Sequence, residues 1–321
     1  MVNQSVQTVP TNSLLSCVIP VYNEAENIVA FIQELSQTLT KFGIGFELIA
    51  IDDGSKDESV AMMHDLIANY PLTIFQFSRN FGKESAMYAG LENSTGDYVA
   101  IMDVDLQDPP ELLVSMYQKL QEGYDSVGAR RISRSGESPL ISFFSRLFYK
   151  IINKVSTTPI VDGARDFRLM TRQVVDSILT LRENNRFSKG LFSWVGYDVT
   201  YLEYENHERS AGQTSWSFSQ LLRYSIDGII NFSEMPLNIA TFVGFFSFLA
   251  SLLLSIFYLL KTLIFGDPVQ GFPTLIVLIL LLGGLQLLSL GIIGKYIAKI
   301  FLETKKRPNY IIKESNLKEL D

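Results

Sequence analysis

The sequence predicts an α/β fold with a mostly parallel, doubly wound sheet, followed by two C-terminal helices that span a membrane. Between residues 15 and 128, short apolar runs alternate with amphipathic stretches of helical periodicity. Strands that alternate with helices are typical of a parallel sheet covered by helices. Near the C-terminus, two consecutive uncharged stretches are each long enough to cross the hydrocarbon core of a bilayer.

Five short apolar runs are the predicted strands, at residues 15–21, 46–51, 72–77, 98–102 and 124–128. Predicted helices separate them, at residues 26–41, 57–69, 83–94 and 110–122. The first helix shows the expected spacing, because its apolar side chains recur on one face. In such sheets ligands bind beyond the carboxyl ends of the strands, so residues that directly follow a strand are candidates for a site.

The membrane helices are predicted from charge and length. Twenty-six residues without a charge lie between Glu234 and Lys261, and 27 lie between Asp267 and Lys295. The short connection between them indicates a hairpin. Basic residues follow the second helix, and the positive-inside rule places that end in the cytoplasm. An even number of spans then places both termini and the N-terminal domain in the cytoplasm.

Composition excludes several classes of protein. The formal net charge of −7 gives no sign of nucleic-acid binding. Cys17 is the single cysteine and there are two histidines, so the sequence predicts neither an internal disulfide nor a structural zinc site. A metal in this protein would need oxygen ligands. Residues 1–13 are polar, lack the features of a signal peptide and are expected to form a disordered tail.

Two further stretches are amphipathic. Residues 139–155 combine apolar side chains with basic ones; the apolar set includes Phe143, Phe144, Leu147, Phe148, Ile151 and Ile152, and the basic set is Arg146, Lys150 and Lys154. Residues 216–234 lead directly into the first predicted membrane helix. Ordinary core packing and a helix that lies in the lipid headgroup plane both fit this pattern, and the interfacial helix is favoured slightly.

The fourth predicted strand ends in a group of oxygen donors, Asp103, Asp105 and Gln107. Two carboxylates two residues apart at a strand end are able to reach one hard cation. Mg²⁺ and Mn²⁺ prefer such ligands, and Mg²⁺ usually binds through one or two carboxylates together with substrate phosphates. An aspartate that only caps the following helix is the alternative.

The other strand ends carry further candidates. Asp52 and Asp53 follow the second strand and are placed to accept hydrogen bonds from a base or a ribose, whereas the neighbouring Ser55 and Asp57 fit a turn and a helix cap. Lys83 opens the third helix after a glycine, and a basic helix start suits anions.

The first strand contributes a separate set. Pro20 lies at its end and is followed by Tyr22, whose ring is able to stack on a base, and Glu24, whose carboxylate is able to bind a ribose hydroxyl.

Taken in chain order, these motifs resemble glycosyltransferase family 2, and within it the polyisoprenyl-phosphate glycosyltransferases such as bactoprenol glucosyltransferases and dolichol-phosphate mannose synthases. The matching pieces are residues 19–24, 52–57, 80–83, 103–111, 163–170 and 208–215, together with the two-helix tail and residues 303–308. The mannose synthases often place a lysine where this chain has Ser215 and Trp216, which weakens the mannose interpretation. A Q-x-x-R-W stretch is missing, which disfavours a processive polysaccharide synthase.

The resemblance implies a GT-A catalytic domain and an inverting reaction. By resemblance, the nucleotide-sugar would be held by Pro20, Tyr22, Glu24, Asp52, Asp53, Lys83, Asp103 and Arg130. The cofactor Mg²⁺ or Mn²⁺ would be held by Asp103, Asp105 and Gln107. Asp166 matches the position of a catalytic base, Asp162 is the fallback, and Arg209 matches a phosphate-binding arginine.

By the same resemblance, the expected function is transfer of a hexose, with glucose from UDP-glucose as the best candidate, to undecaprenyl phosphate at the cytoplasmic face of the bacterial inner membrane, in which the protein would be integral. Another donor sugar (mannose, aminoarabinose or N-acetylhexosamine) and a catalytically silent membrane scaffold are the alternatives. Glycines of the second membrane helix permit close helix packing, so a homo-oligomer is an open possibility. The expected domains are a tail at 1–13, the GT-A domain at 14–215, a juxtamembrane helix at 216–234, a transmembrane hairpin at 235–297 and a cytoplasmic tail at 298–321.

Overall fold

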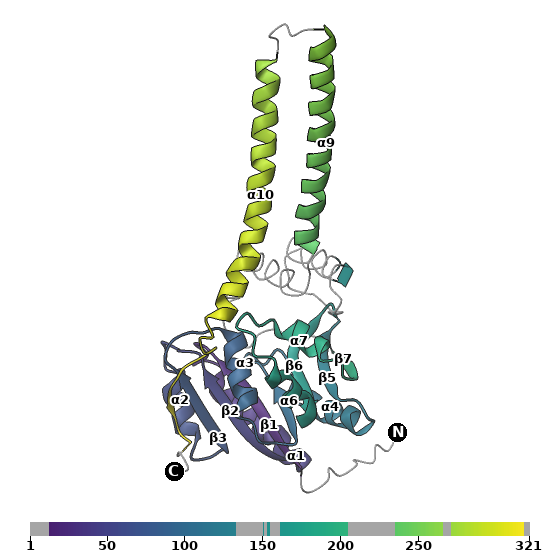
Figure 1. Ribbon diagram of the computed structural model, residues 1–321. Helices are drawn as coiled ribbons and strands as arrows, with labels where there is room; N and C mark the ends of the chain where they lie inside the picture. Colours follow the sequence, from purple (N-terminus) through teal and green to yellow (C-terminus); the bar gives the residue numbers. More distant parts are fainter. Residues whose placement is uncertain are drawn as a thin grey trace.

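A computed structural model describes residues 13–132, 150, 153–154, 161–204, 235–265 and 271–317. The described residues form a three-layer α/β domain and two long helices that leave one end of it side by side (Figure 1). The amphipathic stretches expected at 139–155 and 216–234, and Arg209, lie outside the described residues apart from three positions of the first stretch.

Within the described residues, one sheet of eight strands runs in the order β7-β5-β6-β4-β1-β2-β3-β8. Its strands are β1 (Leu14–Val21), β2 (Gly45–Asp52), β3 (Leu72–Phe77), β4 (Tyr98–Ile101), β5 (Ser126–Arg131), β6 (Ala164–Thr171), β7 (Val199–Tyr204) and β8 (Ile312–Ser315). The pairs among β1 to β4 are parallel, as is β5 with β7, whereas β6 and β8 run antiparallel to their neighbours. The parallel centre directs four strand ends towards one edge of the sheet.

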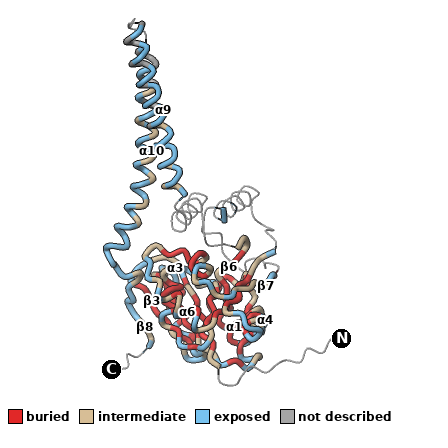
Figure 2. Tube along the Cα trace, turned by 45° about the vertical axis from the view of Figure 1, so that its right-hand side comes forward, coloured by how far each residue is buried: buried red, intermediate tan, exposed pale blue. Residues whose placement is uncertain are grey.

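Helices cover both faces of the sheet. They are α1 (Ile28–Phe42), α2 (Ser59–Leu66), α3 (Lys83–Glu92), α4 (Leu112–Gln121), α6 (Arg172–Thr180) and α7 (Ser188–Trp194). Alternate side chains of β1 divide between two cores: Cys17 and Ile19 pack with α1, α2 and α4, and Val18 packs with α3, α6 and α7. Figure 2 shows the buried residues gathered in this domain. Gly90 permits close approach of α3 to β1, because a Cβ there would lie 2.1 Å from Cγ1 of Val18.

The five predicted strands and four predicted helices of residues 15–128 are present, with ends displaced by a few residues. The sequence analysis did not identify the strands β6, β7 and β8. β6 inserts between β4 and β5, so the sheet is mostly parallel at its centre and mixed at its sides. Insertion of β6 brings residues 164–166 beside the end of β4, which positions the site described below.

Two apolar helices follow, α9 (Met235–Phe265) and α10 (Phe272–Thr304). Windows at Met235–Leu254 and Leu281–Thr304 have the length and composition of membrane spans, with mean hydropathies of 2.0 and 1.5 and no residue buried within the structure. Their large apolar side chains are accordingly exposed, as the pale colour of both helices shows (Figure 2). The two helices predicted as spans are therefore formed, and they are candidates for crossing a membrane.

Candidate functional site

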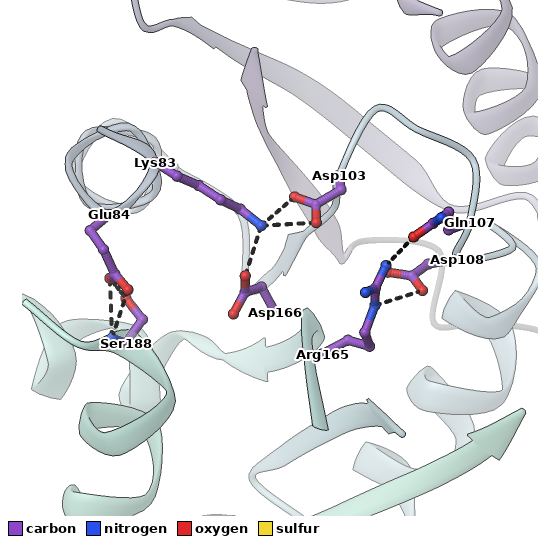
Figure 3. A network of polar contacts seen from close by, with 8 residues as sticks. All are labelled: Lys83, Glu84, Asp103, Gln107, Asp108, Arg165, Asp166 and Ser188. Atoms are coloured by element: carbon purple, nitrogen blue, oxygen red, sulfur yellow. Dashed lines mark hydrogen bonds and ion pairs between the residues drawn. The ribbon is translucent and has the colours of Figure 1, made fainter. Parts of the chain in front are cut away.

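One lysine joins two acidic residues at the carboxyl edge of the sheet. Lys83 is the first residue of α3, and its ammonium lies 2.7 Å from Oδ1 of Asp103 and 2.7 Å from Oδ2 of Asp166. Asp103 follows β4 and Asp166 lies in the antiparallel β6 (Figure 3). The side chains are 39%, 25% and 19% exposed, respectively, so the cluster is accessible from solvent without being fully hydrated. Lys83, Asp103 and Asp166 will be called the Lys83 junction.

The charges in the Lys83 junction support one another. Burial by itself would raise the pKa of Asp166, but the positive charges of Lys83 and Lys189, the hydrogen bond from Lys83 and the charge of Arg168 together hold that pKa well below its usual range. Desolvation opposes the charge on Lys83, and the two carboxylates outweigh it and raise the pKa of the ammonium. Asp166 is therefore ionised at neutral pH and is a weak proton acceptor.

The predicted metal-binding residues lie beside this junction. Asp103 follows β4, and Oδ1 of Asp105 accepts the backbone N–H of Gln107 at 3.2 Å. The side-chain oxygen of Gln107 accepts a hydrogen bond of 2.8 Å from Arg165. The structure thus brings the three predicted ligands into one loop, and it gives the Gln107 oxygen a cationic partner that the sequence analysis did not foresee.

Arg165 is itself held by a buried acid. Its Nε lies 3.4 Å from Oδ1 of Asp108, whose side chain is 1% exposed, and the hydroxyl of Tyr204 also donates to that oxygen. Burial raises the pKa of Asp108, and the Arg165 charge and the Tyr204 hydrogen bond only partly offset this effect. The chain Asp108–Arg165–Gln107 fixes the loop after β4 from the side opposite Lys83 (Figure 3).

The two aspartates that end β2 are buried. Asp52 is fully buried and accepts the backbone N–H of Ser55, and Asp53 accepts the N–H groups of Phe81 and Gly82 at 2.6 and 2.9 Å. Desolvation raises the pKa of both carboxyl groups, with partial compensation by these hydrogen bonds. Asp53 therefore holds the loop that precedes Lys83. The hydrogen bonds of Asp53 thus support a role in loop structure, and its expected contact with a nucleotide stays a prediction.

Gly54 permits close contact between the loop that follows β2 and the loop that follows β3. It has φ +73°, and a Cβ on it would lie 2.6 Å from the carbonyl carbon of Arg79. The expected turn role of Asp57 is also confirmed, because its carboxylate accepts hydrogen bonds from the backbone N–H and the hydroxyl of Ser59, the first residue of α2. Close packing of the β2 and β3 loops thus sets the position at which α3 begins.

The remaining nucleotide-side candidates lie at the end of β1. Pro20 lies within β1 opposite Ile51, and Tyr22 is 43% exposed, so its ring is available for stacking. Glu24 accepts the side-chain amide of Asn27 at 2.8 Å, while its backbone N–H donates to Ser59. β1 neighbours β4 in the sheet, so this end lies on the same edge as the Lys83 junction.

The side chain of Arg130 contacts the backbone of Asp162. Nε of Arg130 donates to the carbonyl oxygen of Asp162 at 3.1 Å, and its guanidinium forms an ion pair with Glu203 at 3.2 Å. This arrangement joins β5, β7 and the segment before β6. Asp166, the first of the two candidate bases, bonds with Lys83, as Asp103 does.

Sequence reasoning missed several residues that build the site. Glu84 follows Lys83 and accepts the backbone N–H of Ser188 at 3.1 Å and also its hydroxyl. This bond connects α3 to α7 (Figure 3). Arg168 is 2% exposed beneath the site, with its guanidinium 3.6 Å from the ring centroid of Phe192. Burial lowers the pKa of Arg168 to about 10. Residues 164–170 matched a family motif, but the pairing of β6 alone places them here.

The acidic residues fit a hard divalent cation that also binds substrate phosphates. The described residues contain no group of three or more His, Cys, Asp or Glu side chains arranged to hold a metal alone. A site with Asp103 and Asp105 as its carboxylates would therefore need oxygens from a diphosphate, which is the usual manner of Mg²⁺ binding. The partly exposed carboxylate of Asp103 is consistent with such a shared site.

Comparisons with known proteins identify the family of the chain. The profile of Glycosyl transferase family 2 matches residues 16–179. A putative glycosyltransferase of Bacillus subtilis (strain 168), CsbB, is 44% identical over 309 residues, 96% of this chain and 94% of its own length. The SfII prophage-derived bactoprenol glucosyl transferase of Shigella flexneri is 42% identical over 303 residues, 94% of this chain and 98% of its own.

Solved structures show a weaker likeness. A mannosyltransferase from Pyrobaculum calidifontis, in complex with GDP-Man and Mn²⁺, superposes with a TM-score of 0.46 at 19% identity, over 62% of this chain and 57% of that chain. The whole-length relatives and the family profile decide the assignment, and the expected GT-A fold and glycosyltransferase activity are confirmed with it. The chain belongs to glycosyltransferase family 2, in the branch that contains the bactoprenol glucosyl transferases.

Proposed function

We propose that this enzyme transfers a hexose, with glucose from UDP-glucose as the first candidate, to undecaprenyl phosphate at the cytoplasmic face of the membrane. The observation that supports the proposal most is the Lys83 junction, in which a cation lies between two carboxylates at the carboxyl edge of the sheet; in the proposed reaction a sugar diphosphate would meet an acceptor phosphate there. The relatives named as bactoprenol glucosyl transferases support the lipid acceptor. The two apolar helices support a membrane location.

In the proposed reaction, an oxygen of the lipid phosphate attacks the anomeric carbon of the donor from the face opposite the diphosphate. The bond from that carbon to the diphosphate breaks, the nucleoside diphosphate leaves with the electron pair, and the anomeric configuration inverts. A phosphate monoester has a second pKa of ~6, so the acceptor is already an anion near neutral pH. Such an acceptor needs little help from a general base.

The chain's own residues supply charge and orientation in this scheme. Asp166 is held ionised by Lys83, which suits it to orient groups and makes it a poor proton acceptor. The Lys83 ammonium lies next to Asp166 and offers a positive charge to an incoming phosphate. Arg165 fixes Gln107 beside the expected diphosphate position.

Mg²⁺ or Mn²⁺, held by Asp103 and Asp105 with Gln107 nearby, would neutralise negative charge that develops on the leaving diphosphate. Substitution of Asp103 by alanine is expected to abolish transfer while the fold is retained. Transfer that continues in the presence of a chelator would contradict the metal proposal.

A panel of radiolabelled donors with undecaprenyl phosphate as acceptor tests the proposed function. Purified enzyme in lipid vesicles should form a glucosyl lipid from UDP-glucose and release the nucleoside diphosphate. A lipid product from GDP-mannose or a UDP-N-acetylhexosamine alone would keep the lipid acceptor and replace the sugar. A donor that is consumed with no lipid product would contradict the acceptor.

A further inference from the structure

The C-terminal end of α10 is bonded to a loop of the catalytic domain. Oε1 of Glu303 accepts the backbone N–H groups of Asn184 and Asn185 at 2.8 and 3.3 Å, and Oε2 accepts the Asn184 side-chain amide at 3.2 Å. One turn earlier in α10, the Lys299 ammonium donates to the side-chain oxygen of Asn185 at 2.6 Å. Two residues of one membrane helix thus bind two adjacent residues of one loop.

The same loop leads directly to the active site. Ser188, which begins α7, donates its backbone N–H and hydroxyl to Glu84. Glu84 follows Lys83, whose ammonium joins Asp103 and Asp166. Between the two contacts, the guanidinium of Arg186 lies 4.4 Å from the ring centroid of Tyr88 in α3. Residues 184–188 therefore contact α10 at one end and the first turns of α3 at the other.

The chain after α10 adds a second attachment. Tyr310 stacks on Phe77 of β3 at a centroid distance of 5.0 Å, and its hydroxyl donates to Glu92 at the end of α3 at 2.5 Å. The side-chain amide of Asn309 donates to the carbonyl of Glu183. In Figure 1, the lower end of α10 accordingly meets the domain beside α3. The end of α10 is thus bonded to the 184–188 loop, and the chain that follows it is bonded to α3.

We propose that Glu303 is a positioning residue, which holds the 184–188 loop against α10 and so fixes the Lys83 junction in place relative to the membrane. The inference rests on the proposed function, because only an acceptor anchored in a bilayer requires such placement. A long polyprenyl chain leaves the bilayer at a cost of roughly 0.8 kcal/mol per CH₂, so its phosphate remains at headgroup level and the site must meet it there. A short acceptor that diffuses in solution has no such requirement.

This difference between acceptors gives the test. Glu303→Ala removes the carboxylate oxygen that accepts hydrogen bonds from the backbone N–H groups of Asn184 and Asn185. Glu303→Gln keeps a side-chain oxygen that is able to accept the same hydrogen bonds. Glu34→Ala is the matched control, because Glu34 is an exposed glutamate in the middle of α1. Each full-length variant is assayed with undecaprenyl phosphate in proteoliposomes and with a short polyprenyl phosphate in detergent, and its Kd for the nucleotide-sugar is measured.

We expect Glu303→Ala to lower kcat with undecaprenyl phosphate in liposomes about tenfold, as the loss of hydrogen bonds to a charged group implies. Transfer to the short acceptor and the Kd for the donor should change less than about twofold, as for an ordinary surface substitution. Glu303→Gln should recover most of the lost rate, and Glu34→Ala should match the wild type in every assay.

Two results overturn the inference while the wild type is active. One is an unchanged rate of Glu303→Ala in liposomes, and the other is an equal loss with both acceptors together with a lowered Tm, which would show a merely structural role. Failure of the proposed function is seen separately, in a wild type that binds the donor and transfers to neither acceptor.

Discussion

At the scale of single residues, charge pairing explains how acidic side chains gather at a site that is proposed to receive an anionic diphosphate. Lys83 carries one positive charge between two carboxylates, and Arg165 carries one between the carboxylate of Asp108 and the neutral amide of Gln107. Both cations are partly screened from water, with side chains 39% and 22% exposed. Each cation therefore stabilises ionised groups that would otherwise be costly to bury.

Lys83→Met should lower the transfer rate about 100-fold at pH 7, as expected for loss of a charged group next to the proposed position of the reacting atoms. It should also change the pH profile. In the wild type, Lys83 holds the pKa of Asp166 well below its usual range, so Asp166 stays ionised between pH 5 and pH 8. Without the ammonium, burial raises that pKa, and the residual rate should fall as the pH decreases through it.

Lys83→Arg keeps the charge and serves as the matched control, with a flat profile over the acid range. Rates measured from pH 5 to pH 8 with saturating donor distinguish the variants. A methionine variant whose profile runs parallel to that of the wild type would show that Lys83 does not control the ionisation of Asp166.

Arg165→Met should lower the free energy of unfolding by about 3 kcal/mol, because it leaves the Asp108 carboxylate buried without its charged partner. Asp108 is 1% exposed, so water has little access to its carboxylate and would not replace the lost charge of Arg165. Arg182→Met, at an exposed arginine, is the control and should change stability by less than about 0.5 kcal/mol. Thermal unfolding in detergent measures both, and equal Tm values for the two variants would contradict the role given to Arg165.

At the scale of elements, the C-terminal strand completes the sheet. β8 pairs antiparallel with β3, which would otherwise be an edge strand with free backbone groups. Asn316 extends the pairing, because its side-chain oxygen accepts the N–H of Ile74 at 2.7 Å and its amide donates to the carbonyl of Leu72 at 3.0 Å. A segment that follows the membrane helices is thereby built into the catalytic domain.

Asn316→Ala should lower the free energy of unfolding by about 1–2 kcal/mol, since it removes two hydrogen bonds to backbone groups of β3. Lys313→Ala is the control, because Lys313 is exposed in the same strand. Chemical denaturation followed by tryptophan fluorescence compares the two. If Asn316→Ala is as stable as Lys313→Ala, the tail does not contribute to the stability of the sheet.

At the scale of the whole molecule, the two long helices present an apolar surface that has no cover within the described residues. Side chains such as Leu287 and Ile264 are 71% and 68% exposed. A contiguous apolar surface of this kind marks an interaction with a membrane or a partner. The bonds from Glu303 and Lys299 fix the position of α10 relative to the catalytic domain.

The proposed topology predicts which side of the membrane each segment faces. Cys17 is fully buried and burial raises the pKa of its thiol, so it is an unreactive background for labelling. A cysteine at Asp267, between the helices in the sequence, should react with a membrane-impermeant maleimide added to cells, and a cysteine at Glu314 should not. Inverted vesicles should give the opposite pattern. Labelling of Glu314→Cys in intact cells would place the catalytic domain outside the cytoplasm.

The sequence by itself determined the strands and helices of residues 15–128, the two apolar helices and the family motifs. These features depend on local periodicity and on residues that are adjacent in the chain, such as Asp103 and Asp105. Tertiary structure decided which of the motifs meet. β6 had no distinctive periodicity, and only its antiparallel pairing with β4 brings Asp166 to Lys83. The Glu303 contacts likewise join residues more than 100 positions apart. Contacts across such distances depend on the packing of the whole chain, which no short window of sequence encodes.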